Sequence, residues 1–252
     1  MVYITGDCHA EFTKFSTKNF PEQKEMTRDD IVIICRDFGG VWDDDKTERY
    51  WLKWLNAKPF TTVFVDGNHE NFDRLYSDEF PIVDLHGGKS HQIREHIFHL
   101  MRGYVFNFEG KKFFAFGGAR SHDIQDGVLD RANYADETLF RQDVALHHLL
   151  HMAFRVNHVS WWEQEMPSRE EMDFGRKTLE DNGNEVDFII THCCPQEVAS
   201  FLGYRQPDLL TAYFNGIAHD VKFDKWYFGH YHDTKTTFCK FVMLYEKIER
   251  VL

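Results

Sequence analysis

Histidine, aspartate and asparagine side chains recur in short clusters that could bind metal ions. Asp7 and His9 stand two positions apart, as do His230 and His232, so in extended backbone each pair points to one side of the chain. The clusters offer imidazole nitrogen together with carboxylate or amide oxygen. That mixture suits manganese, iron or zinc, whereas calcium and magnesium prefer all-oxygen ligands. The candidate ligands are Asp7, His9, Asp37, Asn68, His192, His230 and His232.

This ligand set is too large for one ion. A catalytic zinc ion typically uses about three protein ligands, and the chain offers seven candidates. Two ions that share a bridging carboxylate would use all of them. Gly6, Gly67 and Gly229 adjoin the clusters and would let the backbone approach an ion closely. We therefore expect two divalent ions, manganese first, with iron or zinc as alternatives.

Short buried strands are expected to position these clusters. Continuous apolar runs are typical of strands covered on both faces, and they occur at residues 2–5, 31–35, 61–65, 113–116, 186–191 and 226–228. Helical patterns occur at residues 47–57, 136–150 and 168–180, the last beginning with a Ser168/Glu171 capping box. In open α/β sheets, ligands gather beyond the carboxyl ends of the strands. Each polar cluster stands at such an end.

The alternation of strands and helices predicts an α/β fold. We expect a single domain over residues 1–252, because the chain shows no repeat, linker or low-complexity segment. Residues from about 130 to 167 interrupt the alternation. A helical insertion beside the site is the prediction for that stretch.

The ordered clusters resemble the motifs of the calcineurin-like metallophosphoesterase family. The matching series is Gly6-Asp7-x-His9, Asp37, Gly67-Asn68-His69-Glu70, Thr191-His192 and Gly229-His230-x-His232. The resemblance covers nearly the whole chain. It implies a four-layered αββα sandwich of two mixed central sheets flanked by helices. It also implies one ion on Asp7, His9 and His232, a second on Asn68, His192 and His230, and a bridging Asp37.

The resemblance further implies hydrolysis of a phosphomonoester or phosphodiester through a metal-bridging hydroxide. Two adjacent ions lower the pKa of a shared water and stabilise charge on the phosphate. His69 directly follows Asn68 and is similar to the family's histidine that protonates the leaving alkoxide, a general-acid role. The alternative for His69 is a purely structural role beside the ligands.

Two arginines are candidate substrate-binding residues. The family has glycine before the bridging aspartate, whereas this chain has Arg36 before Asp37. Arg36 could face the phosphate, pair with Asp37 and weaken metal bridging, or face solvent. Arg120 lies in a glycine-containing turn after the 113–116 run and could bind a phosphate as a planar fork, with an ordinary surface position as the alternative.

The charge balance is acidic, with 41 Asp and Glu against 29 Lys and Arg and a net charge of −12. Because nucleic-acid affinity rests mainly on basic groups that neutralise phosphates, we expect a small phosphate ester rather than a nucleic-acid polymer. A nucleotide-like ester could stack on Trp42, Trp161 or Trp162. The alternatives are a non-catalytic metal-binding scaffold of the same fold, or a protein phosphatase. Against a protein phosphatase, the chain lacks the Gly-Asp-x-x-x-Arg-Gly form that marks serine/threonine protein phosphatases, and Asp37 is followed by Phe38-Gly39-Gly40-Val41-Trp42 instead.

Targeting signals are not visible in the sequence. The N-terminal residues lack the basic and apolar regions of a signal peptide, and no apolar run approaches the roughly 20 residues that span a bilayer. The cysteines number five, an odd count, and Cys193 and Cys194 are adjacent, which does not indicate a disulfide framework. We expect a cytoplasmic protein with no membrane association.

Overall fold

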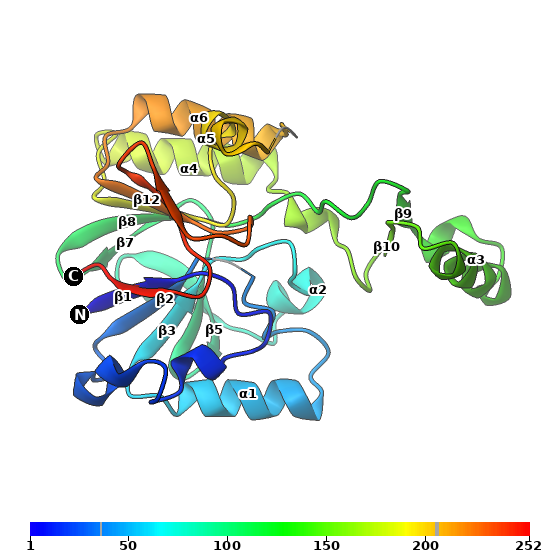
Figure 1. The fold of residues 1–252 in the computed structure, drawn as a ribbon, viewed down its shortest axis with the longest axis horizontal. Helices are drawn as coiled ribbons and strands as arrows, with labels where there is room; N and C mark the ends of the chain where they lie inside the picture. The colour runs from blue at the N-terminus through cyan, green and yellow to red at the C-terminus, as the bar shows by residue number, and fades with distance from the viewer. Residues whose placement is uncertain (36, 205–206) are drawn as a thin grey trace.

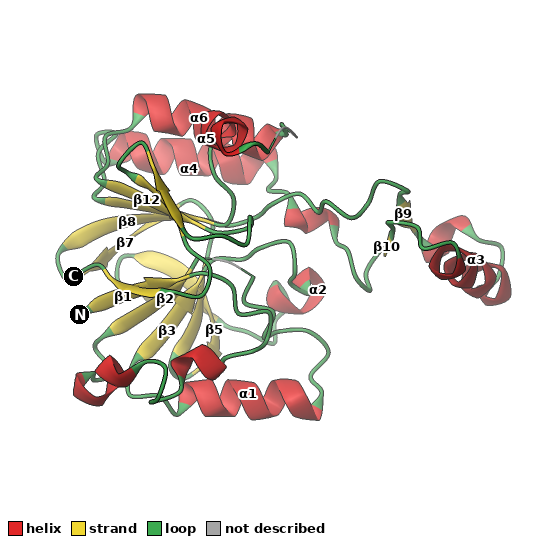
Figure 2. Ribbon diagram, viewed as in Figure 1, coloured by secondary structure: helices red, strands yellow, loops and turns green. Residues whose placement is uncertain are grey.

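Two mixed β-sheets pack face to face, and helices cover both outer faces (Figures 1 and 2). The structure is a computed structural model that describes residues 1–35, 37–204 and 207–252. Helix α1 lies under one sheet, and α4, α5 and α6 lie over the other (Figure 1). This helix–sheet–sheet–helix layering confirms the predicted αββα sandwich.

The first sheet has seven strands in the order β15-β1-β2-β3-β6-β5-β4. Strands β1, β2, β3 and β6 run parallel. The pairs β15–β1, β5–β6 and β4–β5 are antiparallel. The bounds are β1 (Val2–Thr5), β2 (Ile31–Ile34), β3 (Thr61–Phe64), β4 (Ile82–Leu85), β5 (Gly88–Arg94), β6 (Ile97–Leu100) and β15 (Ile248–Arg250).

The second sheet has six strands in the order β13-β14-β12-β11-β8-β7. Its central strands β8, β11, β12 and β14 are parallel, whereas β7 and β13 are antiparallel edges. The bounds are β7 (Tyr104–Phe108), β8 (Lys111–Phe116), β11 (Phe188–Thr191), β12 (Lys225–Phe228), β13 (Lys235–Thr237) and β14 (Phe241–Met243).

The apolar runs form strands because both faces of each central strand are buried. In β2, Ile31 and Ile33 point into the core between the sheets, and Val32 and Ile34 point toward α1. Strand geometry sends successive side chains to opposite faces. A continuous apolar run is therefore needed to fill both layers at once.

Helices α1 and α4 follow the patterns predicted at residues 47–57 and 168–180, whereas α2, α5 and α6 were not predicted. Their bounds are α1 (Lys46–Asn56), α2 (Phe72–Leu75), α4 (Arg169–Asp181), α5 (Gln196–Leu202) and α6 (Leu209–Asp220), with short 3-10 turns η1 (Thr13–Phe15), η2 (Pro21–Glu25) and η4 (Glu163–Glu165). Helix α4 begins with the predicted capping box, in which the Ser168 side chain accepts from the backbone N–H of Glu171 and the Glu171 side chain accepts from that of Ser168.

A long segment extends away from the sandwich (Figure 1). It contains β9 (Val128–Leu129), η3 (Arg131–Asn133), α3 (Glu137–Leu149) and β10 (Arg155–Val156), and α3 contributes no buried residue. Ion pairs fix its base, including His158 Nδ1 at 2.9 Å from Asp73 Oδ2. The assignment of this segment as an insertion within one domain stays a prediction. Among the described helices, none combines the length and apolar character that spanning a membrane requires.

Candidate metal centre

The proposed ligands lie where the carboxyl ends of parallel strands from both sheets meet. Asp7 and His9 follow β1, Asp37 follows β2, and Asn68 and His69 follow β3. His192 follows β11 of the second sheet, and His230 and His232 follow β12. Parallel strands present their carboxyl ends at one edge of a sheet, the usual ligand position in α/β folds. The structure thus brings together side chains that are distant in sequence.

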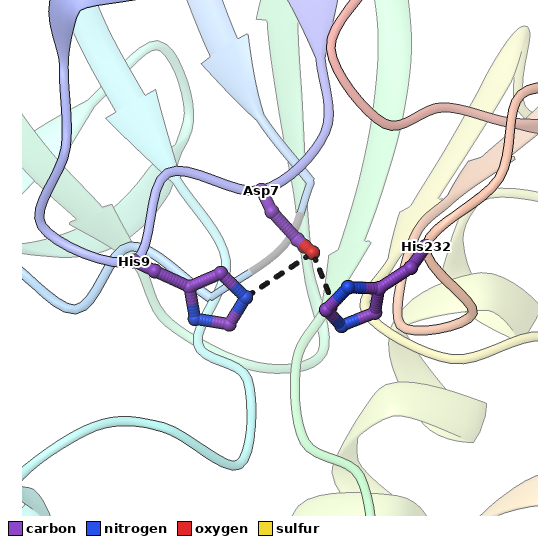
Figure 3. A group of neighbouring side chains, drawn as sticks. All are labelled: Asp7, His9 and His232. Carbon is purple, nitrogen blue, oxygen red and sulfur yellow. Dashed lines mark ion pairs between the residues drawn. The ribbon is translucent and has the colours of Figure 1, made fainter.

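Asp7, His9 and His232 form a first group (Figure 3). One ligand atom from each lies within 4.8 Å of the others. Asp7 Oδ2 is 3.3 Å from His9 Nε2 and 3.6 Å from His232 Nε2. Figure 3 shows the two imidazoles on either side of the carboxylate. Asp7 is buried and both histidines are exposed, so the carboxylate is fixed inside the protein while the two imidazoles are accessible to solvent.

Asn68, His192 and His230 form a second group. His192 Nε2 lies 3.1 Å from Asn68 Oδ1 and 3.1 Å from His230 Nδ1. His192 is fully buried and Asn68 is nearly so. Three nitrogen and oxygen atoms therefore converge at one point of the loop cluster.

Asp37 stands between the two groups. Its Oδ1 lies 3.6 Å from His192 Nε2, and its Oδ2 lies 3.9 Å from His9 Nδ1. The backbone N–H of His69 donates to Oδ1 at 3.0 Å. Asp37 is only 2% exposed, so its orientation is fixed by the surrounding loops. One carboxylate oxygen faces each group, which is the position a bridging ligand requires.

The backbone is shaped around this convergence. His9, His230 and His232 have φ values of 45°, 66° and 52°, in a left-handed region that few residues other than glycine adopt, although histidine does so more often than most. Such strain tends to gather at functional sites. At Gly67 an added Cβ would lie 1.9 Å from Asp37 Oδ1 and 2.8 Å from His192 Cε1, so only glycine permits this approach.

The Gly67-Asn68-His69-Glu70 motif also supports the Asp37 loop. Glu70 is fully buried, and its Oε1 accepts from the backbone N–H groups of Phe38 at 2.7 Å and Gly39 at 3.1 Å. Burial, with a smaller contribution from Asp37, raises the pKa of the Glu70 carboxyl well above its usual value. Sequence reasoning included Glu70 in the motif but assigned it no role.

His122 is a site residue that sequence reasoning missed. Its Nε2 lies 2.5 Å from His230 Nε2, with ring centroids 4.5 Å apart. The preceding residue, Ser121, donates its hydroxyl to buried Glu165 at 2.6 Å and accepts from Asn68 Nδ2 at 3.4 Å. The turn that carries Arg120 and His122 is thereby joined to the second ligand group. Sequence reasoning considered Arg120 of this turn as a phosphate-binding residue and gave His122 no function.

The remaining predicted site residues are His69, Arg120 and Arg36, and they differ in how close to the centre the structure shows them. His69 lies beside the centre, with its ring centroid 5.4 Å from that of His9; burial lowers its pKa, and the Asp37 carboxylate opposes this shift. Arg120 is exposed and lines a cavity next to His230 and His232. Arg36, the other substrate-binding candidate, lies outside the described residues.

The donor chemistry fits divalent transition metals. Both groups combine imidazole nitrogen with carboxylate or amide oxygen, a set suited to manganese, iron or zinc. Cys8 and Cys193 are buried beside the ligand loops, and burial raises the pKa of Cys8 to about 12. Neither thiol belongs to the two groups, whose donor atoms are nitrogen and oxygen.

Comparison with known proteins finds similarity to lariat debranching enzymes. The chain is 26% identical to lariat debranching enzyme A of Xenopus laevis over 154 residues, which is 55% of this chain and 27% of that protein. It is 25% identical to the enzyme of Danio rerio over 154 residues, 55% of this chain and 26% of the relative. The Gallus gallus enzyme is 26% identical over 155 residues, with shares of 55% and 27%. The chain thus spans about a quarter of these relatives. No family model matches the chain.

The relatives overturn the expected substrate class. A small phosphate ester was expected and a nucleic-acid polymer disfavoured, but these relatives are named for debranching lariats, which are branched nucleic acids. The prediction from net charge was wrong because the value of −12 sums the whole surface. Binding of a polymer depends on the local potential at the cleft, where divalent cations, once bound, would add positive charge.

Proposed function

We propose that the chain is a metal-dependent phosphodiesterase with a dinuclear centre and that it hydrolyses a phosphodiester in a branched nucleic acid. The observation that carries the proposal is the placement of Asp37, with one carboxylate oxygen facing His192 and the other facing His9. The similarity to lariat debranching enzymes supports a phosphodiester as the bond that is cleaved and a nucleic-acid polymer as the substrate. Because the chain spans only part of these relatives, their activity is an inference for this protein.

The proposed ligands would hold the two ions as two groups joined by Asp37. Asp7, His9 and His232 would hold one ion, and Asn68, His192 and His230 the other. When bound, two such ions supply Lewis-acid activation of water and neutralise charge on the phosphate. Manganese is the first candidate for both positions, with iron or zinc as alternatives.

The other residues of the site act on the substrate side. His69 stands beside both Asp37 and His9, so it can donate a proton to the oxygen of the leaving alcohol as that oxygen separates from phosphorus. Arg120, exposed at the neighbouring cavity, can pair with a substrate phosphate through its planar guanidinium. Glu70 and Gly67 position the loops that carry the ligands.

The test compares a branched oligonucleotide with a linear one of the same base composition. The wild-type protein, loaded with manganese, is expected to cleave the branch linkage and to bind two ions per chain by elemental analysis. Asp37→Asn should lose both properties, whereas Asp29→Asn, at an exposed surface position, should keep them. Binding of no more than one ion with no diester cleavage would instead support the metal-binding scaffold.

A further inference from the structure

Two cavities border the proposed centre on different sides. The first, of about 470 Å³, is lined by His230 and His232 of the second-sheet loops. The second, of about 400 Å³, is lined by His9 and His69 of the first-sheet loops. Figure 3 shows His9 and His232 on either side of Asp7, so a phosphate at the centre would have one cavity on each side. Both volumes fall in the range of small-ligand sites.

An aromatic pair walls the first cavity. The rings of Tyr204 and Tyr231 have centroids 4.2 Å apart, and the Tyr204 hydroxyl donates to the Tyr231 carbonyl at 3.2 Å. Tyr204 is 40% exposed, so part of the pair faces the cavity. Aromatic rings of this kind are stacking surfaces for nucleobases.

Polar groups of the first cavity are placed to bind a nucleoside and its phosphate. Asp208 lies in the cavity wall, and its Oδ1 accepts from the backbone N–H of Thr211 at 2.7 Å, which caps α6 and fixes the carboxylate. Such a carboxylate can accept from a ribose hydroxyl or an exocyclic amine. Arg120 at the same cavity supplies positive charge. An apolar wall with a few convergent polar groups is typical of a ligand site.

The second cavity has different chemistry. Trp42 and Trp51 line it together with His69, and Asp43 and Asp45 add negative charge. Glu48 is neutralised, because Arg74 Nη1 lies 2.9 Å from its Oε1. The cavity therefore suits the aromatic base of a nucleoside whose phosphate groups point away from Asp43 and Asp45. Trp162 packs edge-on against Trp42 and is itself buried, so of the two only Trp42 offers a surface to a ligand.

We propose that the two cavities are nucleoside subsites for the two alcohol components of the scissile diester. This inference rests on the proposed function. The leaving alcohol takes the Trp42–Trp51 cavity, because its oxygen must lie within hydrogen-bond reach of the His69 ring. The component that keeps the phosphate takes the Tyr204–Tyr231 cavity. In the reaction the bond from phosphorus to the leaving oxygen breaks, that oxygen takes a proton from His69, and a water oxygen bonds to phosphorus as its proton passes to solvent.

The experiment varies only the component that keeps the phosphate. Methyl p-nitrophenyl phosphate and thymidine 5′-(p-nitrophenyl phosphate) share one leaving group, and kcat/KM is measured for both with manganese. The wild-type protein should prefer the thymidine ester. Tyr204→Leu should lower the ratio of the two kcat/KM values by about tenfold, the size expected for one base–aromatic stack. Tyr204→Phe should retain most of the preference, and Tyr50→Leu, at an exposed tyrosine on α1, should keep it fully.

Trp42→Leu provides the opposite signature. It should lower kcat/KM for both esters by a similar factor, because they share the aryl leaving group. The assignment of the cavities would be overturned if Tyr204→Leu left the ratio of the two kcat/KM values at its wild-type value. It would also be overturned if Trp42→Leu changed that ratio as strongly as Tyr204→Leu. If the wild-type protein hydrolysed neither ester with manganese bound, the proposed function itself would fail.

Discussion

The Nε2 atoms of His122 and His230 lie 2.5 Å apart, although 108 positions separate the two residues along the chain. The other ring nitrogen of His230 is 3.1 Å from His192 Nε2. His122 therefore contacts the proposed ligand His230 directly. It lies on a turn that is held in place by hydrogen bonds from Ser121 to Glu165. Side chains that contact metal ligands orient them and tune their basicity.

His122→Ala should weaken binding of the ion assigned to Asn68, His192 and His230. Loss of a residue that contacts a ligand typically costs about 10–100-fold in metal affinity. Manganese titration followed by calorimetry would show one weakened site and one site near its wild-type affinity. His219→Ala, an exposed histidine on α6, is the matched control. Wild-type affinity at both sites in His122→Ala would contradict this role.

His69→Asn should keep both ions and lose activity most on diesters with poor leaving groups. A general acid contributes roughly 10²–10⁴-fold when the leaving oxygen needs a proton. The slope of log kcat/KM against the pKa of the leaving alcohol should therefore become steeper in the variant. An equal loss for aryl and alkyl leaving groups would remove the proton donor from the mechanism, and a drop in bound metal would assign His69 a structural role.

Lys14→Met should weaken the ion assigned to Asp7, His9 and His232. The Lys14 ammonium donates to the carbonyl oxygens of Asp7, of Gly6 at 3.4 Å and of Tyr245 at 3.2 Å. The Tyr245 ring lies 5.3 Å from that of His232, so Lys14 joins the two loops that carry this group. We expect about a tenfold loss of manganese affinity, partly restored in Lys14→Arg. Lys18→Met, at an exposed position, controls for the loss of one positive charge. An equal loss of manganese affinity in Lys18→Met would show that Lys14 does not act by joining the two loops.

The stability of the fold should fall as His91 becomes protonated. Burial, with a smaller effect from His99, lowers the pKa of His91 to about 4; the two Nδ1 atoms are 3.0 Å apart. A histidine whose folded pKa is depressed contributes stability above its unfolded pKa, near 6.5, and loses it as pH falls toward 4.

Urea unfolding of the wild type and His91→Gln checks this titration. The difference in free energy of unfolding between the two proteins should shrink by on the order of 2 kcal/mol from about pH 7 to about pH 4.5. The comparison cancels the carboxylates that titrate in both proteins. A difference that stays constant over this interval would show that His91 is not held neutral.

The sequence predicted six interior strands, namely β1, β2, β3, β8, β11 and β12. It missed the interior strands β5, β6 and β14 and all of the edge strands. Residues 31–35 were expected as a strand and β2 covers Ile31–Ile34, because a strand buried on both faces needs an unbroken apolar run. Strand β4 (Ile82–Leu85) was not expected. It lies at a sheet edge with alternating exposed and half-buried side chains, so its four residues give a weak pattern that its pairing with β5 completes.

The candidate site divides in the same way. Ligand candidates that directly follow apolar runs, such as Asp7 and His192, were visible because the motif and the strand are neighbours in sequence. His122 and Lys14 act through contacts with distant loops, and no local spacing reveals such partners. Their roles depend on how the two sheets meet, which only the tertiary structure shows.

The left-handed backbone at His9, His230 and His232 has a consequence for laboratory evolution. Glycine adopts this conformation without the penalty of about 1 kcal/mol that a side chain incurs. Screening a random library for heat resistance alone would therefore enrich glycine at these three positions. The selected variants would be more heat-resistant but would have lost catalytic activity. A screen for heat-resistant catalysts must therefore select for activity in every round.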